Sequence, residues 1–349
     1  MKLLQKIIKN IQPLDSEIMK KSRTRVDNLI KPPKSLGKLE AITVQLAGIT
    51  KNIHPSVEHK AIIIMAADHG VYEEGVAPNP QSITIEQTLN FPKGLTGVCA
   101  IGEISNAKIV TVDIGINGEL PLNSGVINKK IKYGTDNFAK GPAMTRKEAV
   151  DAIEVGIEIA QQQIKRGVNL IGVGEMGITN TTASTAILAV LGNIPPKEIT
   201  GKGSGLDSKG IQHKIKVIEK AIDINKPDPD DGLDVLAKVG GLEIGGMAGV
   251  ILGSAANRVP VVIDGYIATV SALIAKSIEP KVKDYLIPSH ASMELGGKRA
   301  SELLGVEPML YMNMCLGEGS GAALAFPIID AACNMNDKMI TFKEASMNP

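Results

Sequence analysis

The sequence predicts an α/β fold with a doubly wound, mostly parallel six-stranded sheet and helices on both faces. Two observations lead to this prediction. Short, continuous apolar runs recur along the chain, and such runs are typical of strands buried on both faces of a parallel sheet. Helical patterns lie between most of these runs, which implies crossover connections from one parallel strand to the next.

The predicted strands follow in chain order. Four runs are strong, at 61–67, 109–115, 170–175 and 260–265, and two are weaker, at 285–290 and 309–314. Apolar residues recur at helical spacing in the segments between them. We therefore predict helices over 149–165, 181–191, 211–224, 233–239, 247–256, 266–277 and 301–304, and a further helix over the apolar run 322–332.

The amino-terminal region has a different pattern. Two short amphipathic helices are predicted over 2–11 and 16–30, separated by Pro13. The segment 31–37 contains two consecutive prolines, which exclude regular helix because each removes a backbone donor. Apolar spacing then predicts another helix over 36–49. This end of the chain is therefore expected to be helical.

Composition excludes several classes of protein. The 349 residues carry 38 basic and 37 acidic side chains, a balance that argues against a dedicated nucleic-acid surface. The three cysteines form no C-x-x-C pattern, and the five histidines show no metal-ligand spacing. No apolar run approaches the ~18 residues of a membrane span, and the amino terminus lacks the apolar core of a signal peptide. We expect a cytoplasmic protein that uses no metal and no cofactor.

Polar residues follow the predicted strands. Acids, hydroxyls and imidazoles stand at or just past the strand ends, at Asp68, Asp113, Glu175, Asp264, Ser289, His290 and Glu318. Open α/β sheets bind their ligands at the carboxyl edge of the strands. The sequence therefore predicts a site at this edge, although a structural role remains an alternative for each histidine.

Two glycine-rich loops precede helices. Residues 172–177 match G-x-G-x-x-G, but no second strand with an acid at its end follows, so a dinucleotide fold is disfavoured. The loop is better read as a turn into a helix whose first residues, Asn180 to Thr182, either bind a phosphate or simply cap the helix. The second loop, 201–207, lacks the order of a P-loop. Its backbone amides together with Lys214 are predicted to hold a phosphate, with a solvated lysine as the alternative.

The segment 316–321 places Glu318 between glycines just before an apolar helix. Glycine permits close approach of the backbone to a ligand. Glu318 is therefore either an ordinary first-turn acid or a catalytic base. With neither a metal nor a covalent nucleophile indicated, the remaining groups suit transfer of a phosphorylated ribose, which needs a phosphate anchor and one base.

Taken together, these motifs resemble a known family. They are Lys-Pro-Pro at 31–33, Ala-Ala-Asp-His-Gly-Val at 66–71, Gly-Glu-Met-Gly-Ile at 174–178, Asp-Gly at 264–265, Ser-His-x-Ser-x-Glu at 289–294 and Leu-Gly-Glu-Gly-Ser-Gly at 316–321. In this order they are similar to the nicotinate-nucleotide–dimethylbenzimidazole phosphoribosyltransferases of cobamide lower-ligand assembly. The resemblance extends from about residue 30 to residue 335.

The resemblance implies an activity and a domain organisation. Enzymes of this family move the phosphoribosyl group of nicotinate mononucleotide to dimethylbenzimidazole, with inversion and without a metal. Other purines, benzimidazoles or phenolics are alternative acceptors. The family works as a dimer, here a homodimer or a heterodimer with a paralogous subunit. It also implies a small helical domain from residues 1–30 and 326–349 and a large α/β domain from 31–325.

The resemblance also assigns site residues. Glu318 becomes the general base that deprotonates the acceptor. The remaining residues are expected to bind substrate: Asn79, Pro80, Gln87, Glu175, Met176, Gly177, Asn180, Thr181, Thr182, Gly203, Gly205, Lys214, Asp264, Ser292 and Leu316.

Two positions depart from the family pattern. Cys315 stands where the family usually has arginine, and Gly297 stands where many members have histidine. A thiol cannot replace the five donors of a guanidinium. The alternatives to an active enzyme are therefore a weakly active or non-catalytic subunit that completes a heterodimer, and an unrelated nucleotide-binding α/β protein.

Overall fold

A single parallel sheet organises the chain. The computed structural model describes residues 2–347. Its six strands lie in the order β3-β2-β1-β4-β5-β6, and every pair of neighbours is parallel. The strands are β1 Lys60–Ala67, β2 Lys108–Gly115, β3 Ile127–Asn128, β4 Leu170–Met176, β5 Val261–Ile263 and β6 Leu286–Pro288. The prediction of a parallel, six-stranded α/β fold is confirmed.

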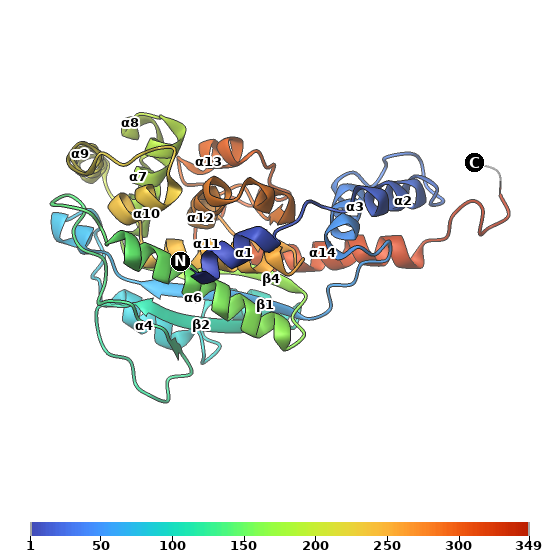
Figure 1. The fold of residues 1–349 in the computed structure, drawn as a ribbon, viewed down its shortest axis with the longest axis horizontal. Helices are drawn as coiled ribbons and strands as arrows, with labels where there is room; N and C mark the ends of the chain where they lie inside the picture. Colours follow the sequence, from blue (N-terminus) through green and yellow to red (C-terminus); the bar gives the residue numbers. More distant parts are fainter. Residues whose placement is uncertain (1, 348–349) are drawn as a thin grey trace.

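Helices cover both faces of this sheet (Figure 1). Ile63 and Met65 of β1 belong to the larger hydrophobic cluster, whereas Ile62 and Ile64 belong to a second one, because alternate side chains of a strand point to opposite faces. Helices α6 Arg146–Lys165, α7 Asn180–Gly192, α9 Ser208–Asn225, α10 Gly232–Val239, α11 Leu242–Ala256, α12 Tyr266–Ile278 and α13 Gly297–Leu304 contribute to the larger cluster. Helices α3 Lys38–Thr50, α5 Gly97–Glu103 and α14 Ser320–Lys338 contribute to the second.

The remaining elements are short or lie at the chain ends. They are α1 Lys2–Asn10, α2 Ser16–Asp27, α4 Ile83–Asn90, α8 Pro196–Ile199 and the 3₁₀ helices η1 Gly70–Glu74 and η2 Pro280–Tyr285. Every predicted helix is present, and most of them are longer than predicted by a few residues. The predicted helix 16–30 is shorter, because the Asn28 N–H bonds back to Thr24 and Arg25 and Leu29 then pairs with Thr341.

One predicted strand is wrong and one strand was missed. The run 309–314 forms only an isolated bridge between Leu310 and His290, and its Tyr311 side chain is 70% exposed. Tyr311 and Met312 are exposed, whereas Met309 packs against the second hydrophobic cluster, so the run lies at the surface and not inside the sheet. The sixth strand is instead β3, which has two residues and pairs with the end of β2. A two-residue strand leaves no apolar run in the sequence.

A small helical module lies away from the sheet. Val26, Leu29, Val44 and Met335 form a separate hydrophobic cluster, which joins α2 and α3 to the end of α14. In Figure 1 this module projects on the side opposite the carboxyl ends of the strands. Helix α1 contributes Leu4 and Ile7 to the main cluster instead. The division into domains at 1–30, 31–325 and 326–349 stays a prediction.

Helices α6 and α11 pack closely through glycines. A Cβ atom added at Gly156 would overlap the carbonyl oxygen of Gly246, and one added at Gly249 would overlap the carbonyl oxygen of Ile153. The two backbones are thus in direct contact. This contact fixes α11 beneath β1 and β4, the strands that border the site described below.

We expect Gly156→Ala to destabilise the protein by about 1–3 kcal/mol, because the added methyl group must separate two packed backbones. The unfolding midpoint in urea measures the effect. Gly141→Ala is the matched control, since no atom lies within 4 Å of a Cβ added there. Equal midpoints for the two variants would contradict this account of the contact.

Candidate active site

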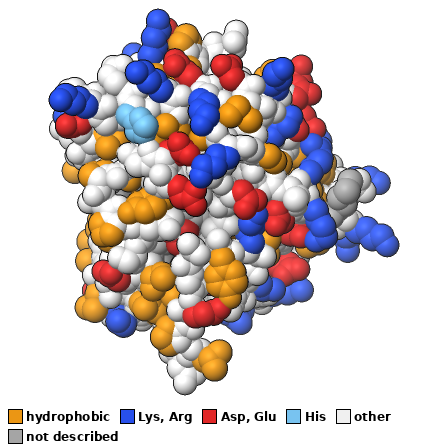
Figure 2. Space-filling model, turned by 90° about the vertical axis from the view of Figure 1, so that its left-hand side faces the viewer, with side chains coloured by type: hydrophobic (Ala, Val, Ile, Leu, Met, Phe, Trp, Pro, Cys, Tyr) orange, Lys and Arg blue, Asp and Glu red, His pale blue; other side chains and the backbone are white. Residues whose placement is uncertain are grey.

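A cavity lies at the carboxyl edge of the sheet, where the strand order reverses. The chain proceeds from β1 to β2 and β3 on one side and from β4 to β5 and β6 on the other. Doubly wound sheets bind ligands at this switch point. The cavity has a volume of about 310 Å³. Figure 2 looks onto this side of the molecule, where acidic and basic side chains are interspersed.

Glu318 lies on a left-handed turn between the cavity and α14. Its φ is +63°, and those of Gly317 and Gly319 are +84° and +90°. Glycine adopts these angles freely, but a glutamate does so only where its surroundings hold it. The turn packs directly on β4, since a Cβ added at Gly174 would overlap the Glu318 carbonyl group. The turn is therefore set by tertiary contacts.

The Glu318 side chain lines the cavity and is 5% exposed. One carboxylate oxygen accepts from the Gln87 amide at 2.6 Å, and the other accepts from the Val98 backbone N–H at 3.3 Å. These two donors come from α4 and α5. They hold the carboxylate in one orientation and leave lone pairs free for a further donor in the cavity.

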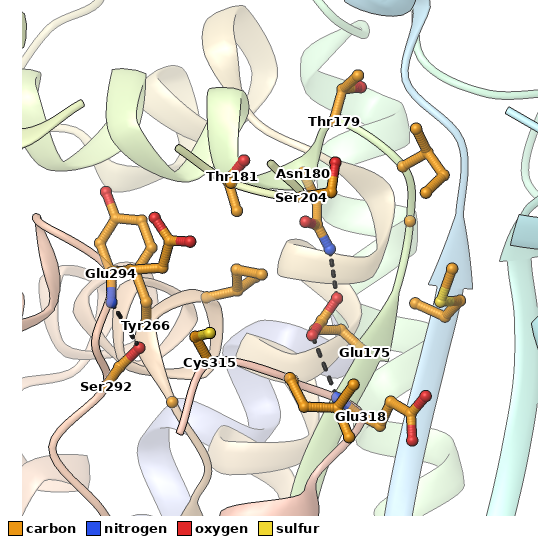
Figure 3. A pocket seen from close by; sticks show the side chains of 18 of the residues that line it. Glu175, Thr179, Asn180, Thr181, Ser204, Tyr266, Ser292, Glu294, Cys315 and Glu318 are labelled. Atoms are coloured by element: carbon orange, nitrogen blue, oxygen red, sulfur yellow. Dashed lines mark hydrogen bonds between the residues drawn. The ribbon is translucent and has the colours of Figure 1, made fainter. Parts of the chain in front are cut away.

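Glu175, at the end of β4, touches the same turn. Its Oε1 accepts from the Glu318 backbone N–H at 3.4 Å, and its Oε2 accepts from the Asn180 side-chain amide (Figure 3). Burial, together with the charges of Asp264 and Glu243, raises the pKa of Glu175 to about 8. At neutral pH this carboxyl group is therefore largely protonated and can also donate a hydrogen bond.

Asp264 follows β5 and is 4% exposed. Its Oδ2 accepts from the Gly319 N–H at 3.1 Å and its Oδ1 from the Gly321 N–H at 2.6 Å. Burial raises the pKa of Asp264 to about 7, against the opposing effect of the backbone donors. His290 Nδ1 lies 3.9 Å from Asp264 Oδ1, and burial lowers the pKa of this histidine. The imidazole therefore remains neutral at pH 7.

Lys214 is the buried cation of the cavity. It projects from α9, is 1% exposed and donates to Thr181 Oγ1 at 2.8 Å. Gly203 packs against both groups, since a Cβ added there would lie 2.9 Å from Thr181 Oγ1 and 3.4 Å from Lys214 Nζ. Burial lowers the pKa of Lys214 to about 8, opposed by the charge of Glu294. A backbone loop, a helix N-terminus and an ammonium group thus meet, which suits an anion.

Most predicted site residues come together here. The cavity is lined by Gln87, Glu175, Met176, Gly177, Asn180, Thr181, Gly203, Lys214, Asp264, Ser292, Leu316 and Glu318. Asn79, Pro80, Thr182 and Gly205 do not line it. Asn79 donates to the Ser204 carbonyl at 3.5 Å, and Thr182 is fully buried within α7. The substrate contacts of all these residues stay predictions.

Several lining residues were not predicted as site residues. Thr179, Tyr266 and Glu294 line the cavity, and the Glu294 backbone N–H donates to Ser292 Oγ at 3.3 Å (Figure 3). Glu294 belongs to the same Ser-His-x-Ser-x-Glu segment as Ser292, which was the available signal. Cys315 also lines the cavity, and its thiol is exposed.

Other strand-end residues stabilise loops instead. Asp68 accepts from the Asn117 N–H at 2.8 Å, and Asp113 accepts from the N–H groups of Gly115 and Ile116. His69 pairs with Glu243 at 2.8 Å, with both side chains fully buried. None of these four side chains lines the cavity. A position at the carboxyl edge of the sheet therefore does not show whether a polar residue lines the cavity or stabilises a loop.

The described residues show neither a metal-binding cluster nor a helix that could span a membrane. Among residues 2–347, no three His, Cys, Asp or Glu side chains gather in a way that would hold a metal ion. Within the same range, every helix is either too short or too polar to cross a membrane.

Known proteins resemble this chain over nearly its full length. A model of a family described as "Phosphoribosyltransferase" matches residues 11–347. A protein of Alkaliphilus metalliredigens (strain QYMF) named nicotinate-nucleotide–dimethylbenzimidazole phosphoribosyltransferase is 66% identical over 347 residues, covering 99% of both chains. One of the same name from Clostridioides difficile (strain 630) is 54% identical, again covering 99% of both. The crystal structure of CobT from Thermus thermophilus superimposes with a TM-score of 0.92 at 37% identity, covering 95% of this chain and 99% of that one.

Proposed function

This chain belongs to the nicotinate-nucleotide–dimethylbenzimidazole phosphoribosyltransferase family, and we propose that it catalyses this reaction with Glu318 as general base. The substrates are nicotinate mononucleotide and an aromatic base, which is dimethylbenzimidazole or a related benzimidazole, purine or phenolic. The observation that carries the proposal is that one cavity contains a buried carboxylate, Glu318, and a buried ammonium group, Lys214. The reaction needs one base and one phosphate anchor.

The nucleotide phosphate binds at Lys214. The Lys214 ammonium, the Thr181 hydroxyl and the backbone at Gly203 are already in contact, so little reorganisation is required on binding. The N-terminus of α7 adds backbone N–H groups and a partial positive charge. Ser292 and Leu316 line the same cavity, and we expect them to contact the ribose.

The acceptor binds beside Glu318. The Met176 and Leu316 side chains supply apolar surface there, and Gln87 orients the carboxylate. With dimethylbenzimidazole as the acceptor, Glu318 takes the proton from one ring nitrogen, and the other ring nitrogen attacks C1′ of the ribose. The bond from C1′ to the pyridinium nitrogen breaks, and its electron pair neutralises that nitrogen. Nicotinate therefore leaves without an added proton, and attack from the opposite face gives the α-riboside phosphate.

The surrounding carboxylates favour this transition state. Positive charge develops on the ribose as the bond to nicotinate breaks, and the Glu318 and Asp264 carboxyl groups line the same cavity. Fixed negative charge in a buried site stabilises such a cation without solvent reorganisation. Protonated Glu175 also retains its hydrogen bonds to the Glu318 turn without adding a second charge next to the base.

We propose that the protein works in the cytoplasm as a dimer with a second copy of itself. Exposed apolar side chains lie in the segments that border the cavity, at Met293, Leu295, Tyr311, Met312 and Leu316. They support a dimer in which the second subunit covers this surface. Pairing with a paralogous subunit is the alternative, and the absence of an arginine at Cys315 is the reason for considering it.

Glu318→Gln is expected to lower kcat by about 10²–10⁴-fold, because the amide keeps the size of the side chain but cannot accept a proton. Nicotinate released in the presence of dimethylbenzimidazole measures the rate. Stabilisation of the variant by nicotinate mononucleotide, seen as a raised Tm, serves as the control for binding. Turnover at the wild-type rate would show that another group is the base.

The affinity for nicotinate mononucleotide is expected to fall as the pH rises above about 8. The pKa of Lys214 is lowered to about 8, so its positive charge is present below that pH and is lost above it. In the pH profile, kcat/KM for the nucleotide should decline on the alkaline side. Lys214→Arg keeps the charge at high pH and should remove the decline, whereas an unchanged profile would exclude Lys214 as the anchor.

The purified chain alone is expected to be an active homodimer. Light scattering after gel filtration gives the oligomeric state, and the nicotinate-release assay gives the activity of the same sample. A chain that is inactive by itself but regains activity with a paralogous subunit would favour the heterodimer.

A further inference from the structure

We propose that Asp264 is a positioning residue, whose carboxylate holds the turn that carries Glu318 rather than contacting the substrate. The proposal rests on the proposed function of Glu318 as the base. It concerns how the fold keeps that base in place.

Asp264 holds two points of the turn at once. One oxygen accepts the Gly319 N–H at 3.1 Å and the other accepts the Gly321 N–H at 2.6 Å. Both donors closely follow Glu318, at the point where α14 begins. The first N–H groups of a helix have no partner within the helix, so a carboxylate there acts as a cap. Each oxygen of Asp264 is therefore already engaged by the backbone.

The turn requires such support. Three consecutive residues, Gly317 to Gly319, have φ between +63° and +90°, and the middle one is Glu318. A left-handed conformation costs a non-glycine residue about 1 kcal/mol or more and persists only where neighbouring groups fix it. Loss of one of these hydrogen bonds would let Glu318 relax to another backbone conformation and move its carboxylate.

Asp264 is itself held by residues that follow β6. Ser289 Oγ donates to the Asp264 backbone carbonyl at 2.8 Å, and His290 lies 3.9 Å from its carboxylate. The start of α14 packs tightly on this pair, since a Cβ added at Gly321 would overlap His290 Nδ1 and lie 2.8 Å from Asp264 Oδ1. The residues that follow β5 and β6 thus form the surface against which the turn packs.

The remaining support comes from β4. The Glu318 N–H donates to Glu175, so two carboxylates from adjacent strands hold the backbone at residues 318, 319 and 321. A substitution at Asp264 disturbs two of these three hydrogen bonds and leaves the Gln87 contact to the Glu318 side chain untouched. The expected defect is therefore in the placement of the base.

The experiment measures kcat and the KM for nicotinate mononucleotide in wild type, Asp264→Asn, Glu318→Gln and the double variant. Asparagine keeps the size but presents an NH₂ group to one of the two backbone donors. We expect kcat to fall by about 10- to 100-fold, as a misplacement of the order of 1 Å does, with KM changed less than about twofold. In the Glu318→Gln background the same substitution should cost less than about twofold, because residues acting through one group are not additive.

Asp113→Asn is the matched control. Asp113 also lies at the end of a strand, is 1% exposed and accepts two backbone N–H groups, at 3.1 and 2.9 Å, but it does not line the cavity. We expect a lower Tm with kcat close to wild type. A kcat loss at Asp264 no larger than at Asp113 would overturn the proposal.

Two other results would also overturn it. A raised KM with unchanged kcat would show that Asp264 contacts the substrate, and an equal loss in both backgrounds would show that it acts independently of Glu318. A failure of the proposed function would be distinct, because wild type would then release no nicotinate or Glu318→Gln would be fully active. If Asp264→Asn does not fold, Ser289→Ala is measured instead. It should lower kcat selectively by about three- to tenfold, and an unchanged kcat would exclude the positioning role.

Discussion

Hydrogen bonds from backbone N–H groups to two buried carboxyl groups hold the Glu318 turn in place. The donors are at Glu318, Gly319 and Gly321, and the acceptors are Glu175 and Asp264. Because β4 and β5 are neighbours in the sheet, their carboxyl ends place both acceptors under the same turn. The sheet order, the close packing of α11 beneath it and the start of α14 all serve this arrangement.

The sequence predicted the parts of the structure that repeat a regular pattern. Continuous apolar runs identified β1, β2 and β4, since both faces of these strands are covered. The same rule failed at 309–314, because the periodicity of an apolar run does not show whether anything covers it. Asp113 and Asp264 illustrate a similar limit for the site. Both stand at a strand end and both accept two backbone N–H groups, and only the fold places Asp264 beside the cavity.

The proposed phosphate side and the proposed acceptor side of the site are built differently. Lys214 and Thr181 are in contact before any ligand binds, and the loop at Gly203 closes against them. The acceptor side combines apolar side chains with one oriented carboxylate, and it includes the exposed Cys315. A preformed anchor and a more open acceptor region agree with a reaction in which the nucleotide is constant and the aromatic base can vary.

Three of the buried ionisable groups of the cavity, Glu175, Asp264 and Lys214, have pKa values that burial shifts towards the neutral form. Burial raises the pKa values of Glu175 and Asp264 and lowers that of Lys214, so each group resists its charged form in the free protein. For the two acids, the pKa is higher in the folded chain than in the unfolded chain. Their contribution to the free energy of unfolding is therefore largest at low pH and is lost as the pH rises from the unfolded pKa towards 7 for Asp264 and 8 for Glu175. For Lys214, the unfolded chain binds the proton more tightly than the folded chain between pH 8 and the ordinary pKa of lysine. The free energy of unfolding therefore rises with pH across that range. A bound phosphate would pair with the ammonium group and raise its pKa, so that the nucleotide brings a proton with it at alkaline pH. The proposed phosphate contact would thus offset the electrostatic cost of burying Lys214 in the free protein.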